Sequence, residues 1–279
     1  MLRKIRANQI VAKALKTRKK YLSVSSSTPI CPYNLADAMG FDVRFVKINS
    51  FEGMYLADEG VILISAERPE GRKAFTCAHE LGHHILGHGT IIDEIIEFGS
   101  DKEIEKEADF FASMLLMPSS VVKRATNDIG ASFQNLSNEQ VYILSKYLGV
   151  SYLALVNQMH FSLNLIDRNS YDRLKRGKLP QVKQNLLQKK TDAEVFIVGN
   201  WWRERAIDIS VGDHLIFDGI ITIEGSSLEG SGGAERIVYQ AIKPGITKVS
   251  NNNGWSAFVR VSKRKFVGMY QYMHEEDVE

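Results

Sequence analysis

The chain has 279 residues, of which 44% are hydrophobic and 24% are charged, as in globular proteins with a buried core. Its formal net charge of +2 gives no overall case for binding nucleic acid or a membrane surface. Two cysteines, Cys31 and Cys77, exclude a disulfide framework, and no apolar run is long enough to cross a bilayer. We therefore expect a cytoplasmic protein that does not bind membranes.

The first 22 residues carry eight Lys and Arg side chains and no acid. Apolar residues recur there at helical spacing: Ala7, Ile10, Val11, Ala14 and Leu15. This spacing predicts an amphipathic helix with a basic face. Faces of this kind are usually only solvated.

Short strand-like stretches follow a helix that Pro32 opens. They cover 41–48, 53–58 and 60–65, and we expect them to form a small antiparallel sheet. Two long helices are then predicted at 71–86 and 101–117, joined by a connector at 90–100. Gly87 and Gly89 mark the end of the first helix.

The predicted elements change from helices to strands at about residue 191. Serine caps predict helices at Ser137–Leu148 and Ser151–Leu163, and Tyr171–Lys190 is predicted to be a helical linker. After residue 191 come short β-rich runs that glycine and asparagine interrupt. Gly225–Gly233 is glycine-rich without the Gly-Lys-Ser/Thr of a phosphate-binding loop, so we expect a flexible hairpin loop.

The segment HELGH at 79–83 carries the strongest chemical signal. His79 and His83 are four residues apart, so both imidazoles leave the same face of the predicted helix. This is the spacing of a metal site that includes its own base, and Glu80 lies where it would reach a water on the metal. Two imidazoles leave Zn²⁺ under-coordinated, so a third protein ligand is expected.

His88 is one candidate for the third ligand. The three-histidine pattern needs glycine at 86 and histidine at 89, but the chain has Leu86 and Gly89. If the helix continued, His88 would lie about 140° round from His83 and would not share its metal.

A glutamate from the second long helix is the other candidate, as in thermolysin-like zinc enzymes. That helix contains Glu103, Glu105 and Glu107. Ala108, Asp109 and Ala112 fall within about 60° of Glu105, and the two alanines would let this face approach another helix. Asp109 would accept the second ring N–H of a zinc histidine. The pattern favours Glu105, with Glu107 as the alternative.

Other candidate groups are less distinctive. We expect His84 to be packed or solvent-facing and the Cys77 thiol to be buried packing. Tyr142, His160 and His214 are candidates to stabilise an oxyanion, but their spacing distinguishes none of them.

Two blocks of sequence together resemble the ImmA/IrrE metallopeptidase family: FEGMYLADEGVILISAERPEGRKAFTCAHELGHHILGH and EKEADFFASMLLMP. The matching positions are Arg72, Phe75, Thr76, Ala78–His83, Glu105, Ala108, Asp109, Phe111, Ala112 and Leu115–Pro118. The resemblance spans roughly residues 30–165 and implies Glu105 as the third metal ligand. Asp109 stands where the family usually has asparagine, and Cys77 where an apolar residue is common.

The resemblance implies a zincin-like metallopeptidase domain, and the strand patterns add a small antiparallel sheet to it and a β-rich C-terminal domain after it. We therefore expect an α+β fold with a mainly helical metallopeptidase domain. We predict a metallopeptidase domain with its basic N-terminal helix at 1–166, a helical linker at 167–190, and a β-rich accessory domain at 191–279. The accessory domain would recognise a substrate or sense a signal.

The predicted function is a gluzincin-like zinc endopeptidase, with Zn²⁺ on His79, His83 and Glu105 and with Glu80 as the base. The family implies a protein substrate such as a helix-turn-helix transcriptional repressor. Direct nucleic-acid binding is not expected, because Ser137–Ile166 is only superficially like a helix-turn-helix. The alternative is a zinc-holding partner-binding or sensor protein of a toxin–antitoxin or phage-defence system, with latent protease activity.

Overall fold

The computed structural model describes residues 4–21, 27–48, 50–88, 101–203, 205–233 and 236–276. The chain divides into two compact units. Unit 1 contains residues 1–124, 148–151 and 267–270, and unit 2 contains 125–147, 152–266 and 271–279. Among the described residues, no helix combines the length and the apolarity that crossing a membrane requires.

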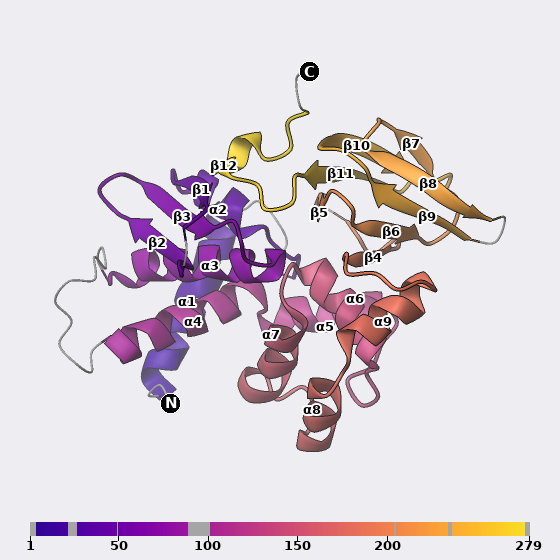
Figure 1. Ribbon diagram of the computed structural model, residues 1–279. Coiled ribbons are helices and arrows are strands. Elements are labelled where there is room, and N and C mark those ends of the chain that lie inside the picture. The colour runs from indigo at the N-terminus through magenta and orange to yellow at the C-terminus, as the bar shows by residue number, and fades with distance from the viewer. Residues whose placement is uncertain are drawn as a thin grey trace. The chain divides into compact units, whose positions relative to one another are not determined.

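Unit 1 is built on four helices: α1 (Lys4–Tyr21), α2 (Pro32–Ala38), α3 (Glu70–Leu86) and α4 (Asp101–Leu116). α4 packs on α3, and α1 packs on α4 (Figure 1). The predicted apolar stripe of α1 is buried at Ile10 and Ala14. Its basic face is not only solvated, since the buried Arg18 guanidinium donates to the backbone oxygens of Leu115, at 2.7 Å, and Thr28.

The sheet of unit 1 has the strand order β12-β1-β3-β2. Its strands are β1 (Asp42–Val46), β2 (Gly53–Leu56), β3 (Val61–Ser65) and β12 (Gly268–Met269). The prediction of an antiparallel sheet was wrong for one pair, because β1 runs parallel to β3. β2 pairs antiparallel with β3 on the side opposite β1, so β3 is paired along both edges. Side chains on both faces of β3 are buried.

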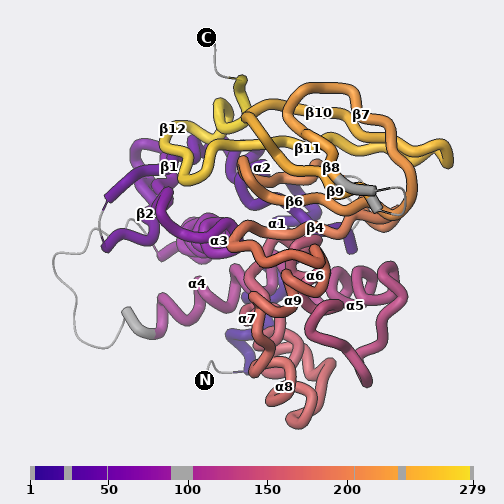
Figure 2. The backbone as a smooth tube through the Cα atoms, turned by 45° about the vertical axis from the view of Figure 1, so that its right-hand side comes forward, coloured from indigo at the N-terminus to yellow at the C-terminus, as the bar shows by residue number. Residues whose placement is uncertain are grey.

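The fourth strand of this sheet comes from the other end of the chain. β12 pairs antiparallel with β1, through Arg44 and Met269 (Figure 2). At the opposite edge, β2 has no strand partner on its outer side among the described residues. A short 3₁₀ helix, Tyr270–Tyr272, follows β12.

The two long predicted helices correspond to α3 and α4, and the connector at 90–100 and Gly89 lie outside the described residues. The helices approach closely at Gly82, where an added Cβ would lie 3.1 Å from the Phe111 ring and 3.3 Å from the Ala108 Cα. Ala108 and Ala112 are fully buried. The prediction that the alanine face of α4 approaches another helix is therefore confirmed.

Further helices follow α4: α5 (Ser119–Asp128), α6 (Asn138–Leu148), α7 (Tyr152–Asn157), α8 (Arg168–Lys175) and α9 (Leu179–Leu187). The predicted serine cap of α6 is present, since the Gln140 N–H donates to Ser137 Oγ at 3.1 Å and the Ser137 N–H donates back to Gln140 Oε1 at 3.0 Å. α7 continues as a π-helix at Gln158–Ser162. α5 does not correspond to any predicted helix.

The predicted helical linker Tyr171–Lys190 is two helices, α8 and α9, with Pro180 in the first turn of α9, where a missing N–H costs nothing. α6 belongs largely to the same compact unit as the strands that follow. The Tyr142 hydroxyl of α6 donates to Glu194, at 2.7 Å, just before the first of these strands. The division at 166 and 190 stays a prediction.

Unit 2 contains two four-stranded sheets, with the orders β5-β11-β10-β7 and β4-β6-β9-β8. The strands are β4 (Val195–Val198), β5 (Ile207–Ser210), β6 (His214–Phe217), β7 (Thr222–Glu224), β8 (Leu228–Gly233), β9 (Arg236–Ala241), β10 (Gly245–Ser250) and β11 (Ser256–Ser262). The predicted loop at Gly225–Gly233 was wrong, because β8 occupies most of it. A Cβ at Gly230 would lie 2.9 Å from the Tyr239 ring, so this glycine makes room for a cross-strand aromatic side chain.

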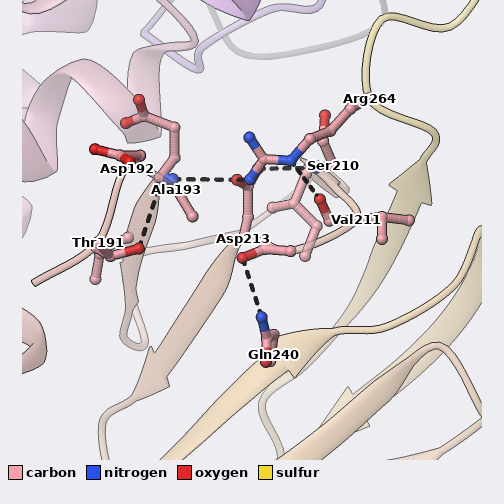
Figure 3. A network of polar contacts seen from close by, with 12 residues as sticks. Thr191, Asp192, Ala193, Ser210, Val211, Asp213, Gln240 and Arg264 are labelled. Carbon is pink, nitrogen blue, oxygen red and sulfur yellow. Dashed lines mark hydrogen bonds and ion pairs between the residues drawn. The ribbon is translucent and has the colours of Figure 1, made fainter. Parts of the chain in front are cut away.

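A buried carboxylate ties several strands of unit 2 together. Asp213 Oδ2 accepts the Ser210 N–H at 2.9 Å, and Oδ1 accepts the Glu194 N–H at 3.1 Å and Arg264 Nη2 at 3.0 Å (Figure 3). Asp213 is 4% exposed. Both oxygens are therefore committed to donors that lie far apart in the sequence.

Candidate metal centre

Three side chains from α3 and α4 converge in unit 1. His79 and His83 leave the same face of α3, with their Nε2 atoms 2.9 Å apart. Glu105 of α4 places Oε2 at 3.1 Å from His79 Nε2 and Oε1 at 3.4 Å from His83 Nε2. One ligand atom from each lies within 4.8 Å of the others, a cluster that could hold a metal ion.

The donor set fits a divalent cation such as zinc. Asp109 Oδ1 lies 2.9 Å from His79 Nδ1, and because a carboxylate only accepts, Nδ1 carries the proton. In neutral His79, the lone pair of Nε2 then points toward His83 and Glu105. Two imidazoles and one carboxylate with an open side make the ligand set of a catalytic zinc site.

The electrostatics of the cluster also favour a positive charge. Burial lowers the pKa of His79, but hydrogen bonds to Asp109 and Glu105 outweigh it and raise that pKa to about 9. Burial and the neighbouring His79 lower the pKa of His83 to about 4. The surrounding carboxylates therefore stabilise one positive charge here, carried by the proton on His79. A bound cation would replace that proton.

The cluster of His79, His83 and Glu105 lines a cleft with a volume of ≈ 390 Å³, and Glu80 lines this cleft as well. Burial raises the pKa of its carboxyl to about 7, the range in which a group exchanges protons readily at neutral pH. The outer wall of the cleft is the edge strand β2, through Gly53–Tyr55. Arg72 and Phe75 of α3 line it as well.

His88 lies beside the cluster but outside the ligand set. α3 does not continue to His88, as Gly87 adopts a left-handed conformation with φ 78° and the His88 N–H donates to the His83 carbonyl at 3.0 Å. This turn brings His88 Nδ1 to 3.1 Å from His83 Nδ1, the nitrogen that faces away from the cluster. His88 is thus close to His83, contrary to the helical projection, without sharing its ligand atom.

Glu107, the alternative third ligand, points elsewhere. Its Oε1 accepts Arg6 Nε at 2.6 Å, and its Oε2 lies 3.2 Å from His88 Nε2. Sequence reasoning missed both Arg6 and this contact with His88. Because Arg6 and Glu107 are 101 residues apart, no local pattern could have found the pair.

The remaining candidates have other partners. His84 Nδ1 lies 2.7 Å from the Tyr55 hydroxyl, and Cys77 is fully buried, as predicted. Tyr142 donates to Glu194, and His160 Nδ1 lies 3.1 Å from the Ile166 carbonyl. Neither these two nor His214 is among the described residues that line the cleft.

Residues 36–160 match the family model of the IrrE N-terminal-like domain, a peptidase family. They belong to the ImmA/IrrE family. The predicted resemblance is therefore confirmed, and the ImmA/IrrE region contains all of His79, His83, Glu105 and Asp109. A metal cofactor is consistent with this membership and with the cluster.

The proteins to which this chain is similar share little of its sequence. The radiation response metalloprotease IrrE of Deinococcus radiodurans is 31% identical over 109 residues, which are 37% of this chain. The chain spans only 33% of that relative's length. Among solved structures, a Mycobacterium tuberculosis transcriptional regulator is 17% identical with a TM-score of 0.38, over 56% of this chain and 48% of that one.

Proposed function

We propose that the protein is a zinc-dependent endopeptidase. The observation that carries this proposal is the convergence of His79 Nε2, His83 Nε2 and the Glu105 carboxylate within 4.8 Å, in a cleft that Glu80 also lines. The third ligand would be a glutamate from a separate helix, the gluzincin arrangement.

The protein's own groups have separable tasks in this reaction. A zinc ion at the cluster would supply Lewis acidity, which lowers the pKa of water and polarises a peptide carbonyl. Glu80 would accept the proton of the attacking water and return it to the leaving nitrogen. Asp109 would hold His79 in the tautomer that keeps Nε2 free.

We further propose a regulatory protein, such as a helix-turn-helix repressor, as the substrate; the family resemblance supports this class. Residues 191–279 lie outside the region that matches the family model. Substrate choice is their proposed role, because the cleft residues belong to the part shared with other metallopeptidases.

The test compares wild type with Glu80→Gln, which keeps the shape of the side chain and removes the base. Both proteins are loaded with zinc, their metal content is measured, and new N-termini are counted after incubation with a proteome and with candidate repressors. We expect equal metal content and a loss of cleavage of about 10²–10⁴-fold in the variant.

Equal cleavage by both proteins would exclude Glu80 as the base. Zinc binding without any cleavage by wild type, together with unfolding on zinc removal, would support the zinc-holding sensor instead, because structural zinc contributes folding energy.

A further inference from the structure

The ring of His83 makes a second contact, on the side away from the metal cluster. His83 Nδ1 lies 3.1 Å from His88 Nδ1, and His88 Nε2 lies 3.2 Å from Glu107 Oε2. Arg6 of α1 donates two hydrogen bonds to the same carboxylate, from Nε to Oε1 at 2.6 Å and from Nη2 to Oε2. The contacts form a continuous series from the N-terminal helix to a metal-binding ring.

This series fixes the direction of each hydrogen bond. The Glu107 carboxylate, paired with Arg6, only accepts, so His88 donates from Nε2. A neutral imidazole that donates from Nε2 accepts at Nδ1, so His83 donates from Nδ1 to His88. The lone pair of His83 Nε2 is then left facing His79 and Glu105.

The members of the series are held in place by burial and by the backbone. The side chains of His88 and Glu107 are only 7% and 10% exposed. The left-handed turn at Gly87 and the bond from His88 N–H to His83 O set the position of the His88 ring. Lys13 adds a second tie between α1 and the end of α3, since its Nζ donates to the Ile85 carbonyl at 3.1 Å.

We propose that His88, Glu107 and Arg6 are positioning residues that orient the metal ligand His83 and fix its tautomer. The proposal rests on the metal centre of the proposed function. It gives His83 a partner equivalent to the one that Asp109 provides for His79, and it gives the basic N-terminal helix a task at the cluster. Partners of this kind are worth about 10–100-fold in metal affinity.

The experiment uses the full chain and reads out metal binding, which needs no substrate. His88→Leu removes both contacts of the ring, whereas His88→Asn keeps an acceptor, Oδ1, near the position of the lost Nδ1. Glu107→Gln removes the negative charge that pairs with Arg6. Glu103→Gln makes the same charge change at an exposed site on α4 and serves as the control. Zinc affinity is measured by competition with a chelating dye, and ligand geometry by the visible spectrum of the Co²⁺ form.

We expect His88→Leu to weaken zinc binding about 10–100-fold and to alter the Co²⁺ spectrum. His88→Asn should recover most of the affinity, Glu107→Gln should weaken it in the same direction, and Glu103→Gln should match wild type. If His88→Leu fails to fold without metal, the comparison of Glu107→Gln with Glu103→Gln still decides the question.

Unchanged affinity and spectra in His88→Leu and Glu107→Gln would overturn the proposal, as would equal losses in His88→Leu and His88→Asn, which indicate packing alone. Wild type that binds no metal would overturn both this proposal and the proposed function. Wild type that binds metal, responds to these variants as expected and cleaves no protein would overturn only the endopeptidase.

Discussion

Gly53 begins β2 and lies close to Thr76 and Glu80 of α3. An added Cβ there would sit 2.3 Å from Thr76 Cγ2, 3.0 Å from Glu80 Oε1 and 3.3 Å from the Leu63 carbonyl. Carbon atoms in contact are normally about 3.5–4.0 Å apart, so we expect the methyl group of Gly53→Ala to push the edge strand β2 away from α3 by about 1 Å.

Overpacking of this size costs about 1–3 kcal/mol, and we expect Gly53→Ala to lower the free energy of unfolding by that amount. The three atoms nearest the new methyl group include Glu80 Oε1 and none from His79, His83 or Glu105. Peptide cleavage should therefore fall at least about tenfold, because misplacing a catalytic group by about 1 Å is costly, while zinc affinity stays near that of wild type.

Thr76→Ser provides the matched control, since it deletes the Cγ2 that the new methyl group would strike. Alone it should cost about 1 kcal/mol, for one buried methyl group. Combined with Gly53→Ala it should restore stability, giving a favourable coupling of at least about 1 kcal/mol in a double-mutant cycle of denaturant unfolding. Strictly additive effects, or a Gly53→Ala protein as stable and active as wild type, would refute this reading of the contact.

Three other changes test the packing of α3 on α4, the hydrogen bonds of Asp213 in unit 2 and the assignment of His79 as a metal ligand. Gly82→Val should push α4 away from α3 and weaken zinc affinity about tenfold or more, measured by chelator competition; unchanged affinity would show that the close approach does not position Glu105. Asp213→Asn should cost about 1–3 kcal/mol in denaturant unfolding, because an amide cannot accept at both positions, whereas the exposed Asp218→Asn should cost little. Free zinc at a hundredfold excess over Kd should stabilise wild type by about 2.7 kcal/mol, and an equal gain in His79→Ala would contradict the ligand assignment.

The features predicted well from the sequence are those that local rules decide. The spacing of His79 and His83 places both on one face of a helix wherever that helix lies. The small side chains Ala108 and Ala112 mark a face for close packing, and Ser137 with Gln140 forms a cap within a single turn.

The features that sequence reasoning missed depend on distant parts of the chain. Strand alternation carries no information on direction, so the parallel pairing of β1 with β3 could not be distinguished from an antiparallel one. β8 is a strand despite its glycines because β9 bonds to it along its length and Tyr239 covers Gly230. The position of His88 depends on the left-handed turn at Gly87, which a projection of a continuous helix does not contain.

In the described part of the chain no strand pairs with the outer edge of β2, and this bears on which proteins the proposed peptidase would cut. The N–H and C=O groups of this edge alternate along the wall of the cleft, and although the Tyr55 backbone already bonds to Glu80, another extended chain could pair with the groups that remain. A helical segment of a target already uses its own backbone N–H and C=O groups within the helix. A folded target would therefore first have to open locally. Cleavage would then follow the population of the opened form, and each additional 1.4 kcal/mol or so of local stability would slow it about tenfold. Targets would thus be sorted partly by how readily they open, before any side chain is recognised.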